Sequence, residues 1–361
     1  MQTLTTIDPD LLTAHDIHHY GSAQLEKFEQ QMARYFSREY RRWQGNKTVP
    51  EEYGVSSFEG GIAAVPTKKV SIEACYDDEY AIYRAFMDRD HMAYTTGYYA
   101  ATAEEVRAST LSLEQAQAQK YELIIERAEI EDGQNILDCG CGFGGLSRYL
   151  LQKFPNVTIT GINPSVVQTD HIKRLIRYHD PYFDSERFRL IDKFIDDIDV
   201  GGDELPAAQF DRVVSVGLLE HVTNIDLLFQ HFSVLLKPGG QCLNHCIVSV
   251  DTIPQLLAAE DTRIGDYFPG GHAWPFDEMP RHNTHLKFCQ RWFINGLNYW
   301  RTLDEWHRRF WDSIDQLYPR HVHNPEELQF WNHYFSLCKA MFLPNEGQSY
   351  GNGHFLYQRP R

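Results

Sequence analysis

The sequence lacks the features that mark membrane and exported proteins. No apolar run approaches the ~18 residues of a membrane-spanning helix, and residues 1–20 are polar and acid-containing, unlike a secretory signal or an arginine-rich transit peptide. Basic residues are scarce, 34 against 50 acidic ones, so the net charge is −16, which disfavours nucleic acid and anionic bilayers as partners. We expect a cytoplasmic protein that acts on a small molecule, with no nucleic acid and no stable membrane association; a homo-oligomer stays open.

Cysteine is also sparse. The seven cysteines are scattered, whereas a secreted disulfide framework usually has an even and denser set. Cys139 with Cys141, and Cys242 with Cys246, lack the spacing of zinc ligands. We therefore expect buried free thiols and no metal site. Hydrophobic residues make up 42% of the chain, enough for a sizeable core.

Short apolar strands alternate with amphipathic helices through the middle of the chain. The predicted strands lie at 135–137, 157–162, 188–191, 213–216 and 241–248. Ser112 and Gln115 form a capping box that begins a helix toward Ala128, and further helices are expected after residue 145, at 166–179 and at 225–236. This alternation predicts an α/β fold with a doubly wound, Rossmann-like parallel sheet.

Helical spacing of apolar residues continues on both sides of this region. Residues 21–46 predict either an amphipathic helix with a solvated basic face or an arm that contacts an anion through Arg38 and Arg42. Two long helices are expected over 303–317 and 328–342, followed by a strand at 353–358. We expect a mainly helical N-terminal cap or lid over 1–110. The α/β domain would cover 111–361, with a helical insertion at about 251–345 that lines the acceptor site.

A glycine-rich turn runs from Asp138 to Gly145, between the first strand and the following helix. In a doubly wound sheet, ligands bind beyond the carboxyl ends of the strands, and glycines allow a tight turn and close approach of the backbone to a ligand. The pattern differs from Gly-x-Gly-x-x-Gly and places an acid before the turn. A carboxylate there suits a cationic amino acid head, as in S-adenosylmethionine, whereas a pyrophosphate favours unobstructed amides. A purely structural turn is the alternative.

The segment 136–145 resembles motif I of the class I S-adenosylmethionine-dependent methyltransferases. More narrowly, the chain is similar to the cyclopropane-fatty-acid-synthase superfamily, which includes mycolic acid methyltransferases and the plant coclaurine-type N-methyltransferases. The similarity covers residues 90–360 and rests on motifs in matching order. They lie at 92–99, 136–145, 211–222, 236–240, 267–271 and 298–299. The resemblance implies S-adenosylmethionine as cofactor and S-adenosylhomocysteine as product.

The resemblance also implies a set of cofactor-binding residues. Tyr94 and Thr95 would close over the cofactor, and Asn163 stands where many methyltransferases have an acid that binds the ribose. Asp192 and Lys193 would bracket the adenine ring. The implied set is Tyr94, Thr95, Asp138, Gly140, Gly142, Asn163, Gln168, Asp192, Lys193 and Val216.

On the acceptor side, the resemblance to cyclopropane synthases implies a site that holds a bicarbonate ion beside the methyl group. The matching positions here are Thr96, Glu220, His245, Ile247 and Tyr299. Thr96 replaces the family's cysteine, so bicarbonate is only an option, although a hydroxyl can still donate a hydrogen bond to an anion or water. Because a proton must leave after methylation, a base is expected among Glu220, His221 and His245. Aromatic faces would stabilise the developing positive charge, from Tyr98, Tyr99 and Phe268.

These residues are compatible with several functions. The first hypothesis is C-methylation of an olefinic carbon of a small isoprenoid diphosphate or related unsaturated metabolite, through a carbocation. Arg38 and Arg42 would bind the diphosphate, and Mg²⁺ would be needed only in that case. The alternatives are N-methylation of a small amine, a cyclopropane-forming lipid methyltransferase, and a non-catalytic cofactor-binding protein.

Overall fold

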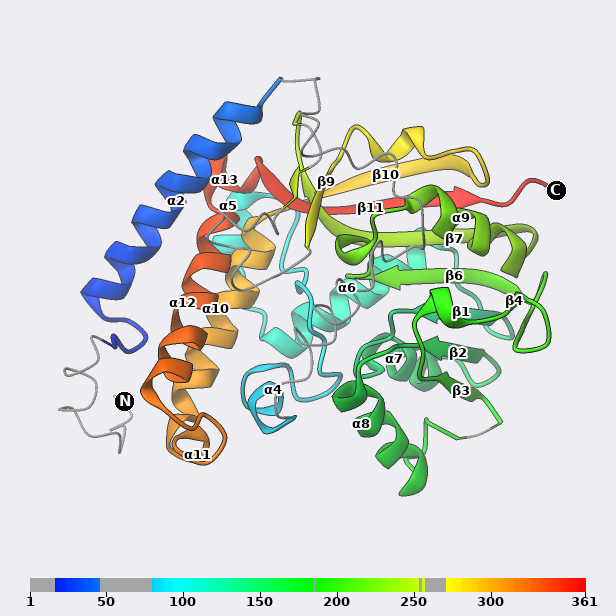
Figure 1. Cartoon of the computed structure of the whole chain (residues 1–361), viewed down its shortest axis with the longest axis horizontal. Helices are drawn as coiled ribbons and strands as arrows, with labels where there is room; N and C mark the ends of the chain where they lie inside the picture. The colour runs from blue at the N-terminus through cyan, green and yellow to red at the C-terminus, as the bar shows by residue number, and fades with distance from the viewer. Residues whose placement is uncertain (1–16, 46–79, 185, 253–254, 257–270) are drawn as a thin grey trace.

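The computed structural model describes residues 17–45, 80–184, 186–252, 255–256 and 271–361. A mixed sheet occupies the centre of the molecule (Figure 1). Its main path runs β10 (Lys287–Asn295), β11 (Tyr350–Gln358), β7 (Leu236–Ser249), β6 (Phe210–Val216), β1 (Asn135–Cys139), β2 (Thr158–Ile162) and β3 (Phe188–Ile191).

The five strands from β7 to β3 are parallel, whereas β10 and β11 are antiparallel additions. The chain moves outward from β1 through β2 to β3 and then returns to β6 on the other side of β1. This reversal places a topological switch point at the carboxyl ends of β1 and β6, where ligands of doubly wound sheets bind. The predicted fold class is therefore confirmed.

Helices cover both faces of the sheet. Neighbouring residues of a strand point to opposite faces, and both faces of the parallel strands carry apolar side chains that need cover. Val214 of β6 packs in the core under α6 (Leu113–Arg127), α7 (Gly145–Lys153) and α8 (Val166–Arg177). Val213 packs in the opposite core with α9 (Ile225–Leu235). The capping box at Ser112 is present at the start of α6, as predicted.

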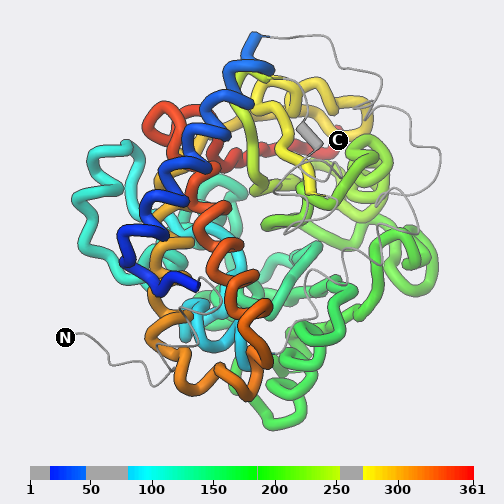
Figure 2. Tube along the Cα trace, turned by 60° about the vertical axis from the view of Figure 1, so that its left-hand side comes forward, coloured from blue at the N-terminus to red at the C-terminus, as the bar shows by residue number. Residues whose placement is uncertain are grey.

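The remaining α-helices of the described part pack on one another beside the sheet (Figure 1). They are α2 (Ala23–Trp43), α4 (Tyr80–Phe86), α5 (Ala103–Ala108), α10 (Leu297–Asp312), α11 (Ile314–Leu317), α12 (Pro325–Met341) and α13 (Pro344–Gly347). Helix α2 lies along α12, although they are far apart in sequence (Figures 1 and 2). Their apolar faces share a core that contains Met32, Phe36 and Trp331, so a helix near the start of the described chain packs on one near its end.

The segment predicted as a helical insertion also contains strands. Besides β10, it includes β8 (Gln255–Leu256) and β9 (His272–Pro275). Strand β10 is an edge strand that leaves Lys287 and Gln290 exposed, so it shows no clean apolar pattern in the sequence. A further small sheet pairs β4 (Val200–Gly201) with β5 (Leu205–Pro206). The expected N-terminal lid stays a prediction, because residues 1–16 and 46–79 lie outside the described part.

Within the described part of the chain, no helix is both long and apolar enough to cross a membrane. The same residues contain no cluster of three or more histidine, cysteine or acidic side chains suited to holding a metal ion.

Candidate active site

The glycine-rich turn connects β1 to α7 at the switch point. Gly140 and Gly144 have φ angles of 82° and 81°, which side chains with a Cβ adopt only at a cost. Gly145 is needed for a different reason: a Cβ there would lie 2.6 Å from the backbone oxygen of His91 and 2.7 Å from the Tyr121 hydroxyl. The turn is therefore in direct contact with the segment that leads to Tyr94.

This contact makes Gly145→Ala a test of the turn. We expect a loss of about 1–3 kcal/mol in unfolding free energy from overpacking, together with weaker binding of S-adenosylhomocysteine, because the His91 segment must move. Gly133→Ala is the control, since Gly133 has φ of 82° but open space around its Cβ position. That variant should lose stability and keep its affinity in titration calorimetry. Unchanged affinity in Gly145→Ala would contradict the assigned contact.

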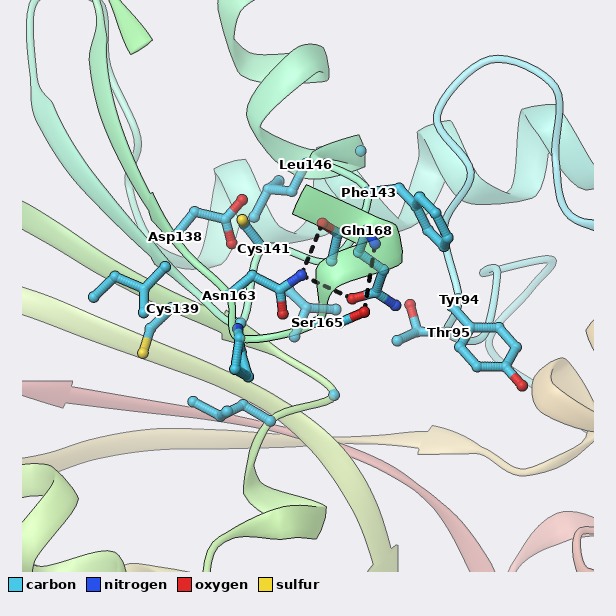
Figure 3. A pocket seen from close by; sticks show the side chains of 18 of the residues that line it. Tyr94, Thr95, Asp138, Cys139, Cys141, Phe143, Leu146, Asn163, Ser165 and Gln168 are labelled. Atoms are coloured by element: carbon cyan, nitrogen blue, oxygen red, sulfur yellow. Dashed lines mark hydrogen bonds between the residues drawn. The ribbon is translucent and has the colours of Figure 1, made fainter. Parts of the chain in front are cut away.

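A cavity of about 1170 Å³, counting the part open to solvent, lies above this turn (Figure 3). Almost the whole predicted cofactor set lines it. The predicted residues in its wall are Tyr94, Thr95, Asp138, Gly140, Gly142, Asn163, Gln168, Lys193 and Val216. Thr95 closes over the end of β6, because a Cβ on Gly217 would come within 2.9 Å of the Thr95 methyl carbon.

Asp138 supplies a buried carboxylate to this cavity. The residue is 1% exposed and accepts a hydrogen bond from the Ser147 hydroxyl at 2.7 Å. Burial raises the pKa of Asp138 to about 6, so the side chain is mainly ionised at neutral pH. Because an isolated buried carboxylate is costly, a cationic ligand group beside Asp138 would be favoured.

Two side-chain amides form another part of the cavity wall. Asn163 donates to the Gly142 carbonyl at 3.2 Å and to the Gln168 side-chain oxygen at 2.8 Å, as Figure 3 shows. The Gln168 backbone N–H bonds to Ser165, which caps α8. These contacts fix both amides at the carboxyl end of β2, where polar groups for a ribose are needed.

The residues present fit S-adenosylmethionine. Asp138 offers a counter-charge for the ammonium of the methionine part, the glycine turn allows close backbone approach, and the amides of Asn163 and Gln168 face the cavity. Asp192 departs from the predicted set: it does not line the cavity, and its exposed side chain pairs with Lys173 at 2.9 Å. Lys193 does line it, although its amine is bound to Glu204 at 2.6 Å.

Glu220 lies beside this cavity, on the short 3-10 turn Leu219–His221 that follows β6. One carboxylate oxygen, Oε1, accepts the Ile247 N–H at 2.7 Å. The other, Oε2, is buried and has no hydrogen-bond partner among the described residues. Burial raises the pKa of Glu220 to about 7, although hydrogen bonds from the backbone N–H groups of Ile247 and of Glu220 itself act to lower it. The neighbouring His221 lines the cavity itself.

Aromatic side chains connect the cofactor cavity to Glu220. Tyr94 stacks on Trp306 with ring centroids 5.2 Å apart, and Trp306 contacts Tyr299 edge-on at 6.3 Å. Tyr299 in turn stacks on Phe342 at 4.7 Å. The pKa of Tyr299 is raised by burial and, secondly, by the charge of Glu220. The structure therefore brings Glu220 and Tyr299 together. We refer to these two residues and His245, which the family resemblance assigns to the same site, as the acceptor wall.

Not all residues matched to the bicarbonate site are free to donate a hydrogen bond to an anion. The Thr96 hydroxyl donates to the Gly97 carbonyl at 2.8 Å, and the Ile247 N–H is taken by Glu220. Two of the expected donors thus have other partners, so the described arrangement does not fit bicarbonate and we derive no step through it.

The predicted acceptor contacts have mixed outcomes. Arg38 and Arg42 are on the solvent side of α2 with Glu39 beside them, and neither lines the cavity; the helix thus matches the interpretation of a solvated basic face. Tyr98 and Tyr99 also lie outside the cavity lining. Tyr99 is buried beneath Arg301. Phe268 lies outside the described residues.

Sequence reasoning missed a buried polar network behind Thr95. Lys120 is 1% exposed, and its amine lies 2.6 Å from both the Thr95 hydroxyl and the Gln117 side-chain oxygen. Burial lowers the pKa of Lys120 to about 7. Sequence reasoning also missed the hydrogen-bonded pair of Arg127 and His354, whose Nη1 and Nδ1 atoms lie 2.8 Å apart. A lysine or arginine on an amphipathic helix carries no sequence signal that separates this buried position from a solvated one.

Comparisons with known proteins agree with this geometry. The family model described as mycolic acid cyclopropane synthetase matches residues 65–350. A probable (S)-tetrahydroprotoberberine N-methyltransferase of Papaver bracteatum is 25% identical over 69% of this chain and 70% of its own length. The cyclopropane-fatty-acyl-phospholipid synthase of Escherichia coli K12 is 28% identical over 66% of this chain and 57% of its own length.

Among solved structures, coclaurine N-methyltransferase bound to N-methylheliamine and S-adenosylhomocysteine superposes with a TM-score of 0.75. The match covers 92% of this chain and 95% of that one at 22% identity, which supports the fold. Since the family model spans most of the sequence, the chain belongs to the mycolic acid cyclopropane synthetase family of S-adenosylmethionine-dependent methyltransferases.

Proposed function

We propose that this enzyme transfers the methyl group of S-adenosylmethionine to the nitrogen of a small amine with an apolar body, and that Glu220 accepts the proton. The observation that carries the proposal is the state of Glu220: its buried carboxylate has a free oxygen and a raised pKa, and no lysine or arginine contributes to that pKa. A buried, uncompensated carboxylate favours a ligand that is cationic or becomes so. The N-methyltransferases among the relatives are consistent with this acceptor.

Different side chains of the site bind the cofactor, stabilise the developing charge and remove the proton. Asp138 and the amides of Asn163 and Gln168 hold the cofactor, whose sulfonium methyl group is already activated for transfer. The enzyme then mainly aligns the acceptor for in-line attack, which can supply several kcal/mol. Aromatic faces such as Tyr299 stabilise the charge that develops on the attacking atom by roughly 0.5–2 kcal/mol. Glu220 removes the proton.

C-methylation of an uncharged olefin is the second candidate. It is favoured by a second unpartnered atom in the acceptor wall, Nε2 of His245, which is buried like Oε2 of Glu220. Removal of a carbon-bound proton needs a held base; Glu220 would be that base, and Nε2 of His245 would hold an oxygen atom by a hydrogen bond. No arginine among the described residues lines the cavity, and Lys193 is engaged by Glu204. The diphosphate part of the first hypothesis, and Mg²⁺ with it, therefore has no supporting contact here.

An acceptor panel tests the proposal. The enzyme would be incubated with S-adenosylmethionine carrying a ¹³C methyl group and, separately, with small ring-bearing secondary amines, prenyl diphosphates, uncharged olefins and unsaturated phospholipid vesicles. We expect methyl carbon resonances attached to nitrogen with the amines. A product methylated on carbon, or a cyclopropane from the vesicles, with amines inert, would replace the first proposal by the corresponding alternative.

The pH dependence of the reaction follows from Glu220. A base must be ionised to act, and the pKa of Glu220 in the free enzyme is raised to about 7, so kcat/KM should increase with pH up to that value and level off above it. Below the pKa the slope should approach about tenfold per pH unit. Steady-state rates measured from about pH 5.5 to about pH 9, a range on both sides of this pKa, would show the rise and the plateau. Persistence of the rise in Glu220→Gln would assign it to another group.

A further inference from the structure

Three side chains from three elements form a hydrogen-bonded row, in which two histidines are buried and Arg127 is half-buried. Nδ1 of His245 on β7 lies 2.8 Å from Nε2 of His354 on β11, its direct cross-strand neighbour. Nδ1 of His354 lies 2.8 Å from Nη1 of Arg127 on α6. Both histidines are at most 1% exposed. The row ends at Nε2 of His245, which is buried and without a partner among the described residues.

The donor order in this row can be deduced from Arg127. A guanidinium group carries only donors, so Nδ1 of His354 must accept. A neutral imidazole that accepts at one nitrogen carries its hydrogen on the other. Nε2 of His354 therefore donates to Nδ1 of His245, and the hydrogen of His245 is placed on Nε2.

The surroundings keep both rings neutral. Burial lowers the pKa of each histidine well below its usual range, and the cations Lys120 and Arg127 on α6 lower it further. Arg127 is itself held in place, because its guanidinium carbon lies 4.9 Å from the ring centre of Trp292 on the neighbouring strand β10. A second proton on either ring would face these two cations.

The free end of the row lies on the same face of the sheet as the cofactor cavity. His245 is the register partner of Val216, and side chains of paired residues share a face of the sheet. Val216 lines the cofactor cavity, so His245 lies on the same face. We propose that Arg127 and His354 are positioning residues that hold His245 with its hydrogen on Nε2, where it donates a hydrogen bond to an oxygen atom at the acceptor wall.

Two consequences follow for the site. His245 has no lone pair free to take up the released proton, which leaves that role to Glu220. Any atom that binds Nε2 of His245 must accept a hydrogen bond, as an oxygen atom does. This inference rests on the methyl-transfer site proposed above, but its main readout does not depend on the identity of the acceptor.

Nitrogen NMR of the full-length enzyme with ¹⁵N-labelled histidine reports the tautomer directly. Signals of His245 would be assigned by their loss in His245→Gln. We expect a protonated Nε2 and an unprotonated Nδ1 in the wild type. A protonated Nδ1, or a doubly protonated ring, in the folded wild-type protein would overturn the proposal, whatever the acceptor proves to be.

Two variants of His354 separate positioning from packing. His354→Gln can still accept from Arg127 and donate to His245, whereas His354→Glu, kept ionised by Arg127, presents only acceptors and should move the hydrogen of His245 to Nδ1. We expect the glutamine variant to stay within a few-fold of wild-type kcat and the glutamate variant to lose about 10-fold or more. S-adenosylhomocysteine affinity should be unchanged in both. Equal losses in both variants, with an unmoved tautomer, would reduce the row to a structural role.

Discussion

Glu220→Gln is expected to lower kcat by about 10²- to 10⁴-fold, the usual contribution of a positioned general base. Glutamine has nearly the same shape and retains an oxygen for the Ile247 N–H, so the fold should be preserved. What it loses is the ability to take up a proton at the unpartnered Oε2. Titration calorimetry should therefore show S-adenosylhomocysteine binding as in the wild type, while turnover with the accepted substrate collapses.

His221→Gln is the matched comparison, because His221 is adjacent, lines the cavity and is an alternative base. It should lose much less activity than Glu220→Gln. If the two results were reversed, the proton would have to leave through His221, and the assignment of Glu220 would be wrong. If neither variant lost activity while both still bound the cofactor, the catalytic interpretation of the acceptor wall would fall.

Asp138→Asn is expected to weaken binding of S-adenosylmethionine and S-adenosylhomocysteine. The amide keeps an acceptor for the Ser147 hydroxyl but removes the charge that faces the cavity. A charge-assisted hydrogen bond contributes about 1.5–3 kcal/mol, so the Kd should rise roughly 10- to 150-fold. Because the pKa of Asp138 is about 6, wild-type affinity should also fall as the pH drops through that value.

Glu122→Gln controls for the change in net charge, because Glu122 is a half-exposed acid on α6 that pairs with Lys153. Its cofactor affinity should match that of the wild type. The kcat of Asp138→Asn at saturating cofactor should fall far less than that of Glu220→Gln. An unaltered Kd in Asp138→Asn would show that the carboxylate serves only the turn, through Ser147.

The fold was predictable because its signals are local. Strand β2 is β-branched at every position except Gly161, α6 begins at the capping box of Ser112, and the glycine turn follows β1 directly. Strand β10 was not predictable, because it is an edge strand whose residues pair with residues of β11 that lie 56 to 71 positions later. Its residues alternate only weakly between buried and exposed.

In the candidate site, too, residues that lie in a local motif were predictable, and residues that meet only in the folded chain were not. Asp138 and Glu220 lie in contiguous motifs, and the structure places both at the carboxyl ends of neighbouring strands. The row from Arg127 to His354 has no such motif, since its members are 227 positions apart and meet only in the folded sheet. Asp192 shows the limit of transfer by motif: its place in the chain suited the adenine, but Lys173 holds its side chain outside the cavity.

The central claim is that the bend at 138–145 binds the S-adenosyl group. Titration calorimetry of the full-length protein with S-adenosylhomocysteine tests it without knowledge of the acceptor. The account predicts saturable uptake of one molecule per chain, weakened in Asp138→Asn and retained in Glu220→Gln. Absence of any binding heat from correctly folded protein, at several temperatures, would contradict it.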